Sequence, residues 1–195
     1  MRVVVIVAHP DPGSFNHAIA TTATASLIRA GHDVTVLDLY AEEFRTAMSL
    51  DERIAYHGER PILDPMAERH AGIVKHAEAL VFVYPTWWST VPAILKGWLE
   101  RVMVPGVGFV FDDKHHVRRG LTHVRRIVGI STYGSRRIYV RALHDNGRRT
   151  LLRALRLNTA IFTRRSWLGL YQMDNRTMEQ RTAFLKRVDR KMRLM

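Results

Sequence analysis

The stretch Pro85–Val102 has the sequence PTWWSTVPAILKGWLERV. It follows Ala79–Tyr84, an uncharged apolar run that is typical of a buried strand. Pro85 ends that strand, and Pro92 is well placed as the first residue of a helix. Two adjacent tryptophans lie between the prolines, on a loop at the carboxyl end of the strand, where open α/β sheets bind their ligands. The stretch therefore predicts a flat apolar surface for a flat ligand.

Strand and helix signals alternate on both sides of this stretch. Apolar and β-branched runs predict strands at 3–8, 33–39, 79–84, 124–132 and 164–170. Helical spacing and capping residues predict helices at 15–30, 65–76, 92–104, 146–156 and 178–193, and residues 41–63 form a long excursion with little periodicity. Five β–α units with parallel-type strands indicate an α/β fold, with a three-layer, doubly wound, parallel five-stranded sheet. We expect a single domain over residues 1–195.

The composition is that of a globular protein, and it excludes several kinds of chemistry. Hydrophobic residues make up 47% of the chain, charged residues 25%, and there is no cysteine. Disulfides, cysteine-ligated zinc and thiol catalysis are therefore excluded. The apolar start, Met1–Ala8, reads as a strand and not as a signal peptide, and the longest uncharged run, Ala79–Leu95, is too short to span a bilayer. We expect a cytoplasmic protein.

The net charge of +12 comes largely from arginine. Arginine doublets recur at 118–119, 125–126, 136–137, 148–149 and 164–165. They form either a solvated basic surface or a surface that attracts an anionic partner, such as a phosphorylated cofactor, an acidic membrane or a nucleic acid. Specific nucleic-acid binding is disfavoured, because aromatic residues are not interleaved with the basic ones.

The loop Ala8–His17 joins the first predicted strand to the first predicted helix. It contains neither the dinucleotide fingerprint G-x-G-x-x-G nor a P-loop. It does contain Ser14 as a helix cap, Asn16 beside it, and the free N–H groups of a helix start, which together suit an anion. The alternative is an ordinary capped helix after a proline-rich turn.

The segment Gly129–Ser135 ends the fourth predicted strand, and its hydroxyls and backbone could bond the edge of a planar ligand. The alternative is a plain exit from a strand. His115 and His116 are adjacent and lack further ligands at suitable spacing, so a metal site is rejected. No serine lies in a G-x-S-x-G elbow, which disfavours a serine hydrolase.

Three segments of the chain resemble the flavodoxin-like NAD(P)H:quinone oxidoreductases, which are small flavin-dependent quinone reductases. These segments are Ala8-His9 with Ser14-Phe15-Asn16, the block Pro85–Val102, and Ser131-Thr132 with Gly134-Ser135 and Tyr139. They follow one another in the family's order and spacing, and Asp38-Leu39-Tyr40 also matches. The resemblance covers residues 3–145, and its most specific part is Pro92–Val102.

The resemblance implies a flavodoxin-like fold with strand order 2-1-3-4-5 and a tightly bound flavin, either FAD or FMN. The residues implied at the phosphate end of the flavin are His9, Ser14, Phe15 and Asn16. Those implied along the isoalloxazine edge are Pro85, Thr86, Trp87 and Trp88, and those at the opposite rim are Ser131, Thr132, Tyr133 and Gly134. Tyr139 and His144 are implied as catalytic residues over the ring.

Two positions depart from the family pattern. The family has two glycines after its two hydroxyl residues, whereas this chain has Tyr133 at the first of them, which would narrow the pocket or reorient the loop. The family's histidine also lies one residue further from its tyrosine than His144 lies from Tyr139. Asp145 is a candidate to orient His144, although adjacent side chains often diverge.

The implied activity is a ping-pong transfer of hydride from NAD(P)H, through the flavin, to a quinone, azo or nitro acceptor. Arg136 and Arg137, just after the rim loop, are expected to attract the extra phosphate of NADPH. The family usually works as a homodimer. The alternative is a flavin-bound ancillary subunit of a potassium efflux transporter, since small relatives include such subunits. Rapid turnover would favour the enzyme, and co-purification with a membrane protein would favour the subunit.

Overall fold

A computed structural model describes all 195 residues and contains five parallel strands in one sheet. The strands, in sheet order, are β2 (Asp33–Asp38), β1 (Arg2–Val7), β3 (Ala79–Pro85), β6 (Arg126–Tyr133) and β7 (Arg164–Tyr171). Counted along the chain, this is the order 2-1-3-4-5 that the resemblance implies, so the predicted fold class is confirmed. β3 is buried along its whole length, as its uncharged sequence predicts.

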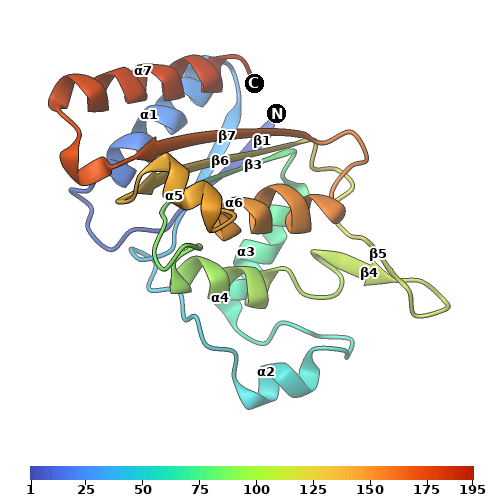
Figure 1. The fold of residues 1–195 in the computed structure, drawn as a ribbon. Helices are drawn as coiled ribbons and strands as arrows, with labels where there is room; N and C mark the ends of the chain where they lie inside the picture. Colours follow the sequence, from blue (N-terminus) through green and yellow to red (C-terminus); the bar gives the residue numbers. More distant parts are fainter.

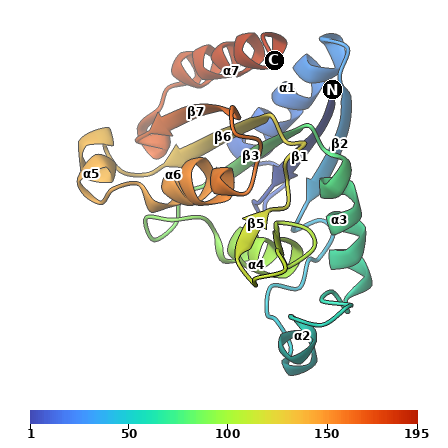
Figure 2. The same cartoon turned by 90° about the vertical axis from the view of Figure 1, so that its right-hand side faces the viewer.

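Helices cover both faces of the sheet and give three layers (Figures 1 and 2). One face carries α1 (Phe15–Arg29) and α7 (Met178–Arg193). The other carries α3 (Pro65–His76), α4 (Ala93–Val102) and a π-helical turn, Thr150–Leu155. Alternate residues of β1 belong to the two separate hydrophobic cores, as the two-residue period of a strand requires. No helix combines the length and the apolar character needed to cross a membrane.

Four segments differ from the sequence prediction, and all involve short elements. The excursion at 41–63 contains a helix, α2 (Leu50–Ala55), and the chain then forms an antiparallel hairpin of β4 (Phe109–Phe111) and β5 (Val117–Arg119). A further helix, α5 (Arg137–Ala142), follows β6, and the predicted helix at 146–156 is divided into α6 (Asn146–Arg149) and the π-helical turn. Elements this short do not complete a readable hydrophobic period. Only α2 carried another signal, the capping box of Ser49 and Glu52.

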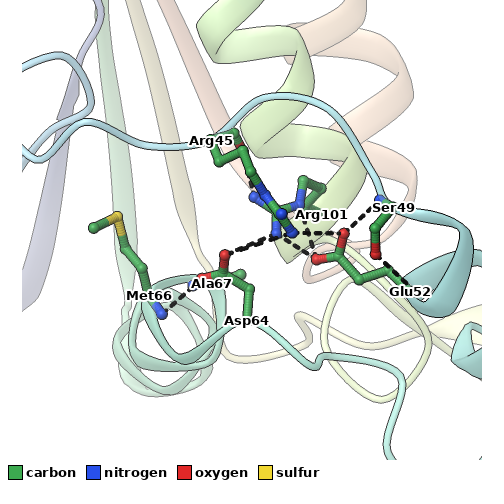
Figure 3. A network of polar contacts seen from close by, with 7 residues as sticks. All are labelled: Arg45, Ser49, Glu52, Asp64, Met66, Ala67 and Arg101. Atoms are coloured by element: carbon green, nitrogen blue, oxygen red, sulfur yellow. Dashed lines mark hydrogen bonds and ion pairs between the residues drawn. The ribbon is translucent and has the colours of Figure 1, made fainter.

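A buried ion cluster connects α2 to the helices beneath the sheet (Figure 3). Arg101 of α4 is almost fully buried, and its guanidinium donates to Glu52 from Nε at 3.0 Å and to Asp64 at 3.0 Å. Asp64 also caps α3 by accepting from two backbone N–H groups. Burial works to raise the pKa of Glu52, but hydrogen bonds from Arg101 and the Ser49 backbone outweigh it and leave the pKa below its ordinary value. The cluster anchors α4, the helix that follows the two-tryptophan loop.

Candidate functional site

The carboxyl ends of β1, β3 and β6 meet at one edge of the sheet, and the segments that follow them line a cleft of about 970 Å³. This volume is within the usual range for small-molecule sites. Eleven of the twelve residues implied to hold a flavin line the cleft: His9, Ser14, Phe15, Asn16, Pro85, Thr86, Trp87, Trp88, Thr132, Tyr133 and Gly134. The parallel sheet brings together loops that lie far apart in the sequence.

The first loop ends in a helix start that is suited to an anion. Ser14 caps α1, and its Oγ accepts from the His17 backbone N–H at 3.3 Å. The His17 ring lies between two partners, with Nδ1 3.1 Å from Ser14 Oγ and Nε2 2.8 Å from Asp38 Oδ2. The backbone N–H groups of Phe15 and Asn16 make no hydrogen bond within the protein. A phosphate or carboxylate placed here would meet two free donors and the positive end of the helix dipole.

Asn16 connects this loop to the end of β6. Its side chain is 3% exposed, and Nδ2 donates to Thr132 Oγ1 at 3.1 Å. Its Oδ1 is buried and has no hydrogen-bond partner. An unsatisfied buried acceptor costs about 1–3 kcal/mol. A hydrogen-bond donor on a ligand in the cleft would remove that cost.

The two-tryptophan loop is a tight, strained turn. Trp87 and Thr90 exchange backbone hydrogen bonds of 3.2 and 3.1 Å, and the two residues between them, Trp88 and Ser89, have φ of 47° and 59°. Left-handed backbone at residues other than glycine costs on the order of 1–3 kcal/mol each, and such strain is concentrated at functional sites. Trp88 is 98% exposed. The Trp87 ring lies 5.9 Å from the ring of His9, so it forms a flat wall beside the first loop.

Ser131 lies behind the cleft and does not line it. Its side chain is fully buried, and its Oγ lies 2.8 Å from Thr86 Oγ1. Side chains alternate along a strand, so Ser131 and Thr132 point to opposite faces of β6. The structure thus places Thr132 in the cleft and gives Ser131 the position of a support for Thr86.

Tyr133, the departure from the family pattern, is held in one orientation. Its ring stacks on Tyr171 with centroids 4.6 Å apart, and its hydroxyl donates to Asp145 Oδ2 at 2.9 Å. Burial raises the pKa of the Asp145 carboxyl, and burial together with the Asp145 charge raises the pKa of the Tyr133 hydroxyl. A half-buried carboxyl with a raised pKa in a cleft wall is a candidate functional group. The suggestion that Asp145 orients His144 is replaced by this contact with Tyr133.

Tyr139 and His144 do not share one position over the cleft. Tyr139, on α5, is 56% exposed and lines the cleft. His144 lies beyond the end of α5, where its φ of 64° turns the chain, and it lines a neighbouring groove. The sequence does not predict α5, which carries Tyr139 and ends before His144, so the expectation that both residues face one substrate does not match the structure.

Ser135, the last residue of the segment Gly129–Ser135, also lines the cleft. Seven further residues line it that the sequence does not predict: Asp11, Ser89, Val140, Leu143, Asp145, Met173 and Asp174. Met173 and Asp174 follow β7. Their position at the cleft could have been predicted from the sequence, because every parallel strand of the sheet ends at this edge. Trp98, in contrast, is fully buried in the core.

Fold and cleft together define a class of protein: an open, doubly wound α/β protein with a ligand cleft at the carboxyl edge of its parallel strands. A family model described as having a flavodoxin-like fold matches residues 1–192. The chain belongs to this family.

Relatives in this family carry names that describe oxidoreductases. The chain is 30% identical over 163 residues to NAD(P)H dehydrogenase [quinone] 1 of Cavia porcellus, a match that covers 74% of this chain and 58% of the relative. It is 31% identical over 157 residues to ribosyldihydronicotinamide dehydrogenase [quinone] of Pongo abelii, which covers 72% of this chain and 67% of the relative. The structure of an NAD(P)H:quinone oxidoreductase from Methanothermobacter marburgensis is similar with a TM-score of 0.82 and 25% identity, over 99% of this chain and 98% of that one.

Proposed function

We propose that the protein is a flavin-dependent oxidoreductase that passes a hydride from NAD(P)H to a quinone, azo or nitro acceptor. The observation that carries the proposal is the cleft, whose lining brings together a helix start with free donors, a flat aromatic wall and Asn16, which holds an unsatisfied buried acceptor. The names of the relatives support the same activity. They are oxidoreductases, which gives the transporter-subunit alternative no support.

The residues present fit FMN or FAD at both ends of the molecule. The free N–H groups of Phe15 and Asn16 suit the flavin phosphate, and Asn16 Oδ1 can accept from a hydroxyl of the ribityl chain. On the opposite side, the backbone N–H groups of Gly134 and Ser135 make no hydrogen bond within the protein. Two adjacent free donors suit the polar edge of an isoalloxazine ring and would stabilise negative charge there.

A bound flavin supplies the redox chemistry, because it can accept a hydride and donate it again. The chain supplies binding and orientation. Trp87 presents an apolar aromatic face along one side of the cleft. Tyr139 is exposed on the lining, where its hydroxyl can donate a hydrogen bond to an oxygen of the acceptor. Asp145 keeps the Tyr133 side chain fixed in the wall.

A homodimer is part of the proposal. On the sequence alone, Trp88, Trp98 and the apolar face of the helix after Pro92 offer more apolar surface than one small domain needs to bury, which favours a dimer. The structure removes Trp98 from this surface, since that side chain is core. Trp88 remains, because an almost fully exposed tryptophan beside the cleft is unusual for a monomer and typical of an interface.

The test is to purify the protein, denature it and identify any released flavin, with turnover of NADPH and a quinone measured on the same sample. We expect about one flavin per chain. Ser14→Ala removes a hydroxyl at the phosphate end and should weaken flavin binding roughly tenfold to hundredfold, which corresponds to about 1.5–3 kcal/mol. The matched control is Ser49→Ala, which removes the cap of α2 away from the cleft and should leave flavin content unchanged. A wild-type protein that binds no flavin on reconstitution would overturn the proposal.

A further inference from the structure

A second concavity lies next to the cleft and is lined with arginine. This groove has a volume of about 620 Å³, and its walls come from α5, α6, the π-helical turn and β7, the orange to red segments of Figure 1. Six arginines line it: Arg137, Arg141, Arg148, Arg149, Arg153 and Arg165. Three of the five arginine doublets of the sequence thus send at least one member into a single groove.

Carboxylates of the protein offset little of the positive charge in the groove. Six arginines elsewhere form ion pairs with carboxylates, whereas none of the six in the groove does. The only carboxylate in the lining is Asp145, which accepts from the Tyr133 hydroxyl. Arg148 lies over the Trp167 ring at 5.9 Å, and Arg165 donates to the Leu152 carbonyl. The side chains of the other four make no hydrogen bond, so their guanidinium donors are free for a ligand.

The shape and the position of the groove indicate what kind of anion it would take. It is concave and of small-molecule size, unlike the flat basic face that an acidic membrane would require. It shares Val140 and Asp145 with the flavin cleft, so one extended ligand can reach both volumes. Guanidinium groups bind phosphate through paired hydrogen bonds. The ligand is therefore small, carries several phosphates and has its other end at the flavin.

We propose that this groove binds the adenosine phosphates of the dinucleotide reductant and makes the protein prefer NADPH to NADH. The inference rests on the proposed function for the nicotinamide end of the ligand. NADPH differs from NADH by a 2′-phosphate, which adds negative charge where six arginines lie that form no ion pair within the protein. Because these arginines are exposed, their attraction is screened over roughly 8–10 Å at ordinary ionic strength, and affinity falls as salt rises.

The binding test uses adenosine 2′,5′-bisphosphate, which carries no nicotinamide and needs no flavin to bind. Calorimetry on the wild-type protein should show binding at least roughly tenfold tighter than that of 5′-AMP. The variant Arg141→Gln/Arg149→Gln keeps helix-forming side chains and should weaken adenosine 2′,5′-bisphosphate by roughly tenfold or more. The matched control, Arg60→Gln/Arg190→Gln, removes the same charge from two exposed positions outside the groove and should bind as the wild type does.

Equal weakening in the control would show a general effect of net charge and overturn the inference. Absence of binding to the wild type, or binding only to phosphatidylserine vesicles, would also overturn it. The kinetic counterpart is a Michaelis constant for NADPH that rises roughly tenfold in the groove variant, and by a larger factor than the Michaelis constant for NADH, which lacks the 2′-phosphate.

The two proposals fail separately. A protein that contains flavin and reduces quinones but does not bind the bisphosphate refutes only the groove. A protein that binds the bisphosphate but never takes up flavin refutes only the proposed function.

Discussion

His70 of α3 should make the stability of the protein depend on pH between 7 and 5. The imidazole is fully buried, and its Nδ1 accepts from Trp98 Nε1 at 3.0 Å. Its Nε2 lies 3.0 Å from Glu42 Oε2, to which it can donate, and its ring stacks on Phe44. A proton on Nδ1 would face the indole N–H and break the contact with Trp98. Burial, aided by the positive charge of Arg69, lowers the pKa of His70 to about 4.

The direction of the effect follows from proton uptake. In the unfolded chain the histidine has a pKa of about 6.5, so between pH 6.5 and 4 the unfolded state binds more protons than the folded state. Stability is therefore greatest above pH 6.5 and is lost as the pH falls. A difference of about 2.5 pKa units corresponds to about 3 kcal/mol in total, of which about 2 kcal/mol is lost between pH 7 and 5.

The assay is urea unfolding followed by tryptophan fluorescence at pH 7 and pH 5, on the wild type and on His70→Asn. Asparagine keeps an acceptor for the Trp98 N–H and takes up no proton in this range. The variant should lose about 2 kcal/mol less than the wild type between the two pH values, whatever its absolute stability. His57→Asn changes an exposed imidazole and should keep the wild-type pH dependence. Equal losses in the wild type and His70→Asn would refute the reasoning.

Two further predictions concern the cleft. Tyr139→Phe should lower the turnover number by roughly tenfold to hundredfold with flavin content intact, and by more than His144→Ala does, because only Tyr139 lines the cleft. Stopped-flow rates of both half-reactions would measure the two effects. A larger loss of turnover in His144→Ala than in Tyr139→Phe would contradict the prediction. Light scattering at micromolar concentration should show that the wild type is a dimer. Trp88→Ser should shift the equilibrium toward monomer, because the substitution removes an exposed aromatic surface of the kind enriched at interfaces. A wild type that is only monomeric would exclude the homodimer.

Local sequence signals were sufficient for the long elements. The uncharged run before Pro85 predicted β3, and proline at the start of the next helix predicted α4, whose N-cap is Pro92. The capping box of Thr177 and Gln180 is present with both of its hydrogen bonds. These signals are readable because strand burial and helix capping depend on neighbours within a few residues. The same locality explains why the two three-residue strands and the two six-residue helices, α2 and α5, are not predicted from the sequence.

The candidate site was predictable as a set of loops but not as a set of contacts. In a parallel sheet, the loops that follow the strands all lie at the carboxyl edge. The place of the cleft and most of its lining residues could therefore be predicted from the sequence. Which side chains face the cleft depends on the alternation within β6, and this separates Ser131 from Thr132. The turn at His144, set by a helix too short to predict, moved that residue out of the cleft.

By itself the sequence determined the fold class, the position of the cleft and the residue types around it, because these depend on hydrophobic patterning and on prolines, caps and aromatics at fixed places along the chain. Only the tertiary structure decided that Tyr133 bonds Asp145, that the buried His70 accepts a hydrogen bond from Trp98, and that arginines from three separate doublets line one groove. Each of these depends on the distance between side chains remote in sequence. The packing of α5, α6 and β7 sets those distances in the groove, and this packing cannot be predicted from any local sequence pattern.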